Sequence, residues 1–114
     1  MSDCIFCKII NREIPSTVVY EDDKVLAFKD ISPEAPVHVL IVPKKHIGSI
    51  LEIDDTNVDY IKDIHFAAQK VAEITGIKDS GFRLITNCGP DSGQTVFHIH
   101  YHLVGGRSLG THIL

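Results

Sequence analysis

The stretch His98-Ile99-His100-Tyr101-His102-Leu103-Val104 constrains the fold more than any other part of the chain. Its histidines alternate with apolar residues, which is the two-residue period of a β-strand with one apolar face. In such a strand all three rings point to one side, with neighbouring rings starting ~7 Å apart. One metal ion could therefore take two of these rings but hardly three. Three imidazoles on one face are costly to bury without partners, so the pattern favours a functional face over a solvated strand with chance histidines.

Composition limits the classes of protein to consider. A chain of 114 residues predicts one domain over residues 1–114. A net charge of −4 argues against a nucleic acid polymer as partner but leaves room for a mononucleotide. The sequence suggests no signal peptide and no membrane span, so we expect a cytoplasmic protein with no membrane partner. The odd cysteine count, three, favours reduced thiols or a metal over disulfides.

The order of the expected elements indicates an α+β domain. We expect a short helix over Cys4–Asn11 capped by Asp3, strands over Thr17–Glu21, Val25–Lys29, Val37–Val42 and Phe82–Thr86, a long helix from Asp54 or Asp55 to Gly76, and the histidine strand. Short turns join most strands, which predicts a five-stranded antiparallel sheet with the helices packed on one side. The apolar stripe of the long helix fits either its own sheet or a partner subunit.

Two cysteines one helical turn apart, Cys4 and Cys7, are either reduced core thiols or half of a zinc site. No second Cys-x-x-Cys follows them. His46 and one ring of the histidine stretch would complete a Cys2His2 set.

The central ring, His100, is a candidate nucleophile, because a neutral imidazole attacks phosphorus when a partner on Nδ1 leaves Nε2 unprotonated. His102 would bind a phosphoryl oxygen or protonate the leaving group. Just upstream, the loop Asn87–Thr95 offers N–H groups, an amide and hydroxyls for a phosphate, although an ordinary turn has the same composition. The patterns of a serine-hydrolase elbow and of a Walker loop are absent from the sequence.

These residues resemble the histidine triad (HIT) family, especially its Hint-type purine nucleoside phosphoramidase branch. The resemblance rests on the triad with its lead-in Gly93-Gln94-Thr95-Val96-Phe97, and on Cys4–Ile10, Asp30–Pro33, His38 and Val42–Ile47. It covers nearly the whole chain. It implies a HIT-like fold whose sheets associate in a homodimer.

The resemblance implies hydrolysis of the P–N bond in purine nucleoside 5′-phosphoramidates, which are AMP-linked amines, through a covalent nucleotidyl-histidine. His100 would be the nucleophile, His102 would contact the phosphate and assist proton transfer, and His38 would hold the histidine network. The implied nucleotide-binding residues are Asp30 for the ribose, Asn87, Gly93, Gln94 and Thr95 for the phosphate, and Phe6, Ile9, Ile14, Phe28, Ile31 and Leu40 for the base. The alternative is a purine-nucleotide-binding regulatory or interaction module with little turnover.

Bacterial relatives with Cys-x-x-Cys imply a structural Zn²⁺ on Cys4, Cys7, His46 and His98, with no organic cofactor. Four protein ligands leave no open coordination position, although a metal-dependent hydrolase or a metal store is a third interpretation. Two departures from the family stand out. Thr95 replaces the usual serine, and the tail Ser108–Leu114 lacks the tryptophan of eukaryotic relatives, which puts leaving-group specificity in doubt.

Overall fold

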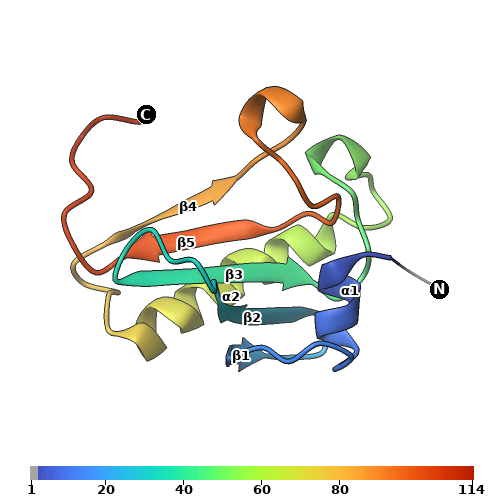
Figure 1. Ribbon diagram of the computed structural model, residues 1–114, viewed down its shortest axis with the longest axis horizontal. Coiled ribbons are helices and arrows are strands. Elements are labelled where there is room, and N and C mark those ends of the chain that lie inside the picture. Colours follow the sequence, from blue (N-terminus) through green and yellow to red (C-terminus); the bar gives the residue numbers. More distant parts are fainter. Residues whose placement is uncertain (1–2) are drawn as a thin grey trace.

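The computed structural model describes residues 3–114 and forms the predicted α+β fold around a five-stranded antiparallel sheet (Figure 1). The strands are β1 (Val18–Glu21), β2 (Val25–Lys29), β3 (Val37–Pro43), β4 (Phe82–Thr86) and β5 (Tyr101–Gly105), in the order β1-β2-β3-β5-β4. The helices are α1 (Ile5–Ile10) and α2 (Asp59–Thr75), with short 3-10 turns at Ile50–Glu52 and Pro90–Ser92. Within residues 3–114 no helix is long and apolar enough to cross a membrane.

The two helices lie on opposite faces of the sheet, so the prediction that they share one side is wrong. Val39 and Ile41 of β3 belong to the large core beneath α2, whereas Leu40 and Val42 belong to a smaller core with Phe6 of α1. The reason lies in β3 itself, which is buried from His38 to Pro43 without interruption. A strand with two apolar faces needs cover on both.

The histidine stretch enters its strand later than predicted. β5 begins only at Tyr101, which pairs with Ile41 on one side and with Thr86 at the end of β4 on the other. β4 ends at Thr86 and so offers no ladder partner to the residues before Tyr101, whereas β3 continues to Pro43 with β2 as its partner. There the Ile99 N–H donates to the Ile47 carbonyl oxygen at 2.6 Å. The alternation nevertheless persists, because Ile99, Tyr101 and Leu103 all enter the core beneath α2.

Two helix starts also differ from expectation. Cys4, not Asp3, caps α1, because its Sγ accepts a hydrogen bond from the Cys7 N–H at 3.4 Å. The long helix starts at Asp59, since residues 54–58 form a separate turn in which Asp54 Oδ1 accepts from the Thr56 N–H at 2.8 Å. Its end is as predicted, at Gly76 with a left-handed φ of 79°.

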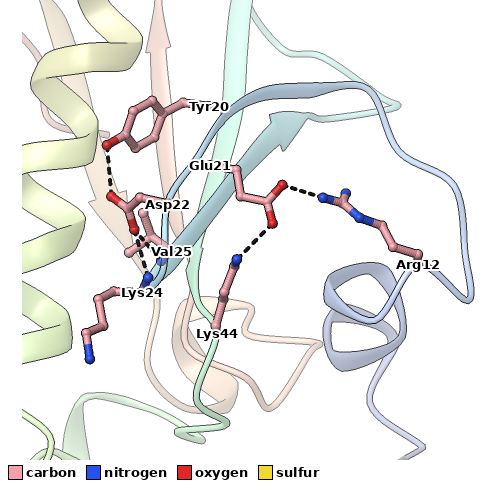
Figure 2. A network of polar contacts seen from close by, with 7 residues as sticks. All are labelled: Arg12, Tyr20, Glu21, Asp22, Lys24, Val25 and Lys44. Atoms are coloured by element: carbon pink, nitrogen blue, oxygen red, sulfur yellow. Dashed lines mark hydrogen bonds and ion pairs between the residues drawn. The ribbon is translucent and has the colours of Figure 1, made fainter.

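A polar network fastens α1 to the sheet (Figure 2). The Glu21 carboxylate, at the end of β1, accepts from Lys44 Nζ at 2.8 Å and also pairs with the Arg12 guanidinium just beyond α1. The hydrogen bond from Lys44 is the main cause that lowers the pKa of Glu21. Glu21 therefore links the helix that carries Cys4 and Cys7 to the segment that leads into His46.

Candidate active site and metal centre

The four side chains implied as metal ligands lie together, from three different parts of the chain. Cys4 Sγ is 3.4 Å from His98 Nδ1, and Cys7 Sγ is 3.3 Å from His46 Nδ1 and 3.5 Å from His98 Nδ1. All four donor atoms lie within 4.8 Å of one another. Zn–S bonds of ~2.3 Å and Zn–N bonds of ~2.0–2.1 Å at tetrahedral angles require S···N distances of ~3.5 Å. The cluster therefore fits the donor set and the size of a zinc site.

His98 is held in the form that a metal requires. Its Nε2 lies 2.8 Å from the Pro43 carbonyl oxygen, which only accepts, so Nε2 carries the proton and the lone pair of Nδ1 faces the sulfurs. The side chain is fully buried, and this burial lowers the pKa of His98 to about 4. The ring is consequently neutral at physiological pH. Four donors from the chain would complete a closed site of the structural type.

His100 has the opposite arrangement of its proton. Its Nδ1 is 2.8 Å from the His98 carbonyl oxygen, so Nδ1 carries the proton and Nε2 keeps its lone pair. The Thr86 hydroxyl donates to the main-chain carbonyl of His100 at 2.9 Å, and the Phe6 ring packs edge-on at 4.9 Å between centroids. These contacts fix an imidazole whose unprotonated nitrogen suits nucleophilic attack.

A chain of hydrogen bonds also sets the tautomer of His102. The Glu34 N–H donates to His38 Nδ1 at 3.1 Å, so the proton of His38 is on Nε2. This Nε2–H donates to His102 Nδ1 at 2.9 Å, which leaves His102 with its proton on Nε2. Burial, followed by the neighbouring histidines, lowers the pKa of His102. The ring centroids of His100 and His102 are 5.2 Å apart, so a ring with a lone pair on Nε2 neighbours a ring with a proton on Nε2.

The same hydrogen bonds argue against a second metal site. Asp30, His38 and His102 also place donor atoms within 4.8 Å of one another, and Asp30 Oδ2 is 3.5 Å from His38 Nε2. However, the Glu34 N–H occupies the lone pair of His38 Nδ1, so His38 Nε2 carries a proton and has no lone pair for a metal. This cluster is therefore a hydrogen-bond relay.

The residues implied for the phosphate are distributed over the loop after β4. Asn87 lines a cavity together with His102, whereas Thr95 lines another together with Cys4 and His46. Gln94 is buried, and its amide donates to the carbonyl oxygens of Gly48 at 3.0 Å and Val96 at 3.1 Å. The structure thus uses the side chain of Gln94 to shape the loop. Gly93 has a φ of 86°, which favours glycine at this turn.

Most of the residues implied for the base form one apolar cluster beside α1. Phe6, Ile9, Phe28 and Leu40 are buried there with Leu26 and Val42, and Ile14 packs against them. Ile31 stands apart with 98% exposure. The sequence did not identify Leu26 and Val42 as members of this apolar cluster. It also did not identify three groups that fix the histidines: the Thr86 hydroxyl, the Pro43 carbonyl and the Glu34 N–H. The last two are main-chain groups, which no residue type can signal.

Comparison with known proteins agrees with the resemblance found in the sequence. The model of the HIT domain family matches residues 11–109. A 14 kDa zinc-binding protein of Brassica juncea is 50% identical over 109 residues, which covers 94% of this chain and 96% of that protein. A purine nucleoside phosphoramidase of Escherichia coli strain K12 is 48% identical over 108 residues, 95% of this chain and 91% of that protein.

Solved structures agree as well. A HIT family hydrolase from Clostridium thermocellum matches with a TM-score of 0.97 at 60% identity, covering 100% of this chain and 99% of that one. The family match and these identities extend over nearly the whole sequence. The chain therefore belongs to the histidine triad (HIT) domain family.

Proposed function

We propose that this protein hydrolyses the P–N bond of purine nucleoside 5′-phosphoramidates through a covalent nucleotidyl intermediate on His100. The single observation that carries the proposal is the pairing of tautomers. The main-chain carbonyl of His98 leaves a lone pair on His100 Nε2, while His38 leaves a proton on His102 Nε2. The Escherichia coli relative named purine nucleoside phosphoramidase supports the substrate class.

The proposed reaction has two displacements at phosphorus. In the first, His100 Nε2 bonds to phosphorus, the P–N bond breaks, and the departing nitrogen takes the Nε2 proton of a His102 ring that has gained a second proton, so that this ring is left neutral. In the second, water attacks phosphorus, the bond to His100 breaks, and a proton of that water returns to His102. The contact of His38 Nε2 with His102 Nδ1 orients the His102 ring for both proton transfers.

The nucleoside would lie on the α1 side of the histidines. The base would contact the buried apolar cluster of Phe6, Ile9, Phe28 and Leu40, with Ile14 at the edge of this cluster. Ile31, which follows Asp30 in the sequence, is exposed. Asp30 is the proposed partner of the ribose hydroxyls, and its carboxylate already lies beside His38. The phosphate would meet Asn87, Gly93 and Thr95, with Gln94 holding their loop.

Cys4, Cys7, His46 and His98 would hold a structural Zn²⁺, in keeping with the Brassica juncea relative named as a zinc-binding protein. When bound, the ion supplies a cross-link among these four residues and no open coordination position. His98 then needs no part in the chemistry. Its contribution is the main-chain carbonyl that orients His100.

We also propose that two copies associate. α2 exposes two large apolar side chains, Phe66 at 56% and Ile74 at 58%, and β4 is an edge strand with Ile85 at 40% exposure. A second copy would cover such surfaces. Light scattering across a range of protein concentrations tests this, and a monomer at every concentration would contradict it.

The function is tested by rapid acid quench of wild-type protein with adenosine 5′-phosphoramidate, followed by intact mass analysis. We expect a transient adduct with the mass of an adenylyl group. His100→Ala should form no adduct and lose turnover by at least ~10³-fold, while its affinity for AMP stays measurable. A wild-type protein that binds AMP without turnover would instead support the alternative, a regulatory nucleotide-binding module.

A further inference from the structure

We infer that Glu52 is a positioning residue, which holds the phosphate loop in place through the main chain of Gly48 and the side chain of Gln94. The phosphate loop is the segment Asn87–Thr95, and the inference rests on the proposed function, which brings the phosphate to this loop. Glu52 Oε1 accepts from the Gly48 N–H at 3.0 Å, and the Gly48 carbonyl oxygen accepts from Gln94 Nε2 at 3.0 Å. Glu52 therefore fixes the residue to which Gln94 is bonded.

Gln94 is the buried side chain that carries this contact into the phosphate loop. Its Oε1 accepts from the Gly89 N–H at 3.0 Å, and its Nε2 also donates to the Val96 carbonyl oxygen at 3.1 Å. The side chain is buried, so a shift of the Gly48 carbonyl would take an acceptor away from a buried amide, which is costly. The Gln94 amide must therefore follow Gly48, and the main chain at Gly89 and Val96 follows the amide.

The main chain of Glu52 is anchored independently of the phosphate loop. The buried Asn57 side chain donates from Nδ2 to the Glu52 carbonyl oxygen at 3.0 Å, and its Oδ1 accepts from the Asp54 N–H at 2.8 Å. These residues belong to the segment that leads into α2. Figure 1 shows this segment, in green, beside the orange phosphate loop at one end of the sheet. Glu52 thus has a fixed base from which its carboxylate reaches Gly48.

The contact with Glu52 leaves room only for glycine at position 48. A Cβ on Gly48 would lie 2.8 Å from the carboxyl carbon of Glu52 and 2.9 Å from its Oε1. Both distances are well inside the ~3.5–4.0 Å at which carbon atoms pack, so a larger residue would push the flexible Glu52 side chain away. The φ of Gly48 lies outside the left-handed region. The carboxylate, and not the backbone conformation, therefore explains the glycine.

The residue before Gly48 limits how far its release would spread. The Ile47 carbonyl oxygen accepts from the Ile99 N–H at 2.6 Å, so the segment between His98 and His100 keeps its own hold on residue 47. The main chain of Gly48 has no such second partner for its bond to Gln94. Loss of the Glu52 contact should thus move the phosphate loop while His100 stays in place.

The experiment compares Glu52→Ala and Gly48→Ala with Glu52→Gln, and Glu73→Ala serves as the matched control. Glu73 is an exposed glutamate on α2. Two quantities are measured: hydrogen exchange of the Gly89 amide by NMR, and the ratio of the Kd for adenosine to the Kd for AMP. The first reports the phosphate loop in the absence of ligand. The second isolates the phosphate, because the two ligands differ only in that group.

For both Glu52→Ala and Gly48→Ala we expect Gly89 exchange to accelerate ~10-fold and the Kd ratio to fall ~10-fold, because binding groups lose most of their effect when they are displaced. The Kd for adenosine and both quantities in Glu73→Ala should stay within ~2-fold of wild type. Glu52→Gln should recover most of both quantities, since its amide oxygen keeps an acceptor without the charge. The double variant of Gly48→Ala and Glu52→Ala should be no worse than either single one, because both remove the same contact.

Unchanged Gly89 exchange in Glu52→Ala would overturn the hold of Glu52 on the phosphate loop. Faster exchange with an unchanged Kd ratio, or losses that add in the double variant, would overturn the proposed route through Gly48 to the phosphate. If Glu52→Ala fails to fold, Glu52→Gln and Gly48→Ala carry the same comparison. A wild-type protein that binds adenosine as tightly as AMP would contradict the proposed function instead, and Gly89 exchange would still decide whether Glu52 holds the loop.

Discussion

His38 donates from Nε2 to Nδ1 of His102 at 2.9 Å, and this contact determines which nitrogen of His102 presents a proton. The donor is itself fixed by the Glu34 N–H on its other nitrogen. The two side chains come from β3 and β5, neighbours in the middle of the sheet, so their separation is set by the ladder between the strands. The acid–base function proposed for His102 depends on this contact.

His38→Ala should therefore reduce kcat with little effect on nucleotide binding. Without the donor on Nδ1, His102 loses both its fixed tautomer and the contact that orients its ring. We expect kcat to fall ~10²-fold, the scale of removing an orienting partner of a general acid. Steady-state kinetics and AMP titration check this. A kcat within ~3-fold of wild type would show that His102 needs no orienting partner.

Disruption of the metal cluster should lower the free energy of unfolding strongly while it affects the rate of catalysis less. In the zinc-loaded protein, Cys4→Ser should lower the free energy of unfolding by at least ~2 kcal/mol and the Tm by roughly 10 °C, because the cross-link of α1 to His98 is lost. Calorimetry and metal analysis measure both effects. Cys88→Ser, a cysteine outside the cluster, is the matched control. Purified wild type that lacks metal, with unchanged stability of Cys4→Ser, would refute the structural zinc.

Stability should depend on pH through His102. Its pKa is lowered in the folded protein, mainly by burial, so below its ordinary value of 6.5 the unfolded chain binds more protons than the folded one. The free energy of unfolding should thus decrease as the pH falls below 6.5, and the loss is complete below the folded pKa. His102→Gln should weaken this dependence. Denaturant titrations of both proteins between pH 7.5 and pH 5 make the comparison, and parallel curves would contradict it.

Ile31 gives a clean test of the base site. Its side chain is 98% exposed, so Ile31→Ala should leave the free energy of unfolding within ~0.5 kcal/mol. If the base covers this side chain, the truncation should weaken AMP binding by ~3–10-fold through lost apolar burial. Calorimetric titration measures the affinity. An unchanged affinity would remove Ile31 from the nucleotide site.

Much of the fold was predictable because each signal was local. The strands β1 to β4, the stop at Gly76 and the antiparallel direction of the strands follow from alternation, turn residues and a single long helix. The start of β5 was not, because it depends on contacts with distant parts of the chain: β4 ends opposite Tyr101, and the Ile99 N–H donates to the Ile47 carbonyl oxygen. The cover on both sides of β3 depends on tertiary packing as well, although its uninterrupted apolar run was visible in the sequence.

The candidate site divides in the same way. Cys4, Cys7, His46 and His98 are residue types with a known chemistry, and the fold brings them together. The resemblance also anticipated the histidine network around His38. What the sequence did not reveal are the partners that assign protons, because Pro43, Glu34 and His98 act through main-chain groups whose position exists only in the folded chain.

The central claim, that His100 bonds to phosphorus, is tested most directly by the stereochemistry of the reaction. A substrate whose phosphorus is made chiral with sulfur is hydrolysed in ¹⁸O-labelled water, and the configuration of the product is determined. Two in-line displacements, first by His100 Nε2 and then by water, predict overall retention of configuration at phosphorus. Inversion, the outcome of a single direct attack by water, would contradict the account.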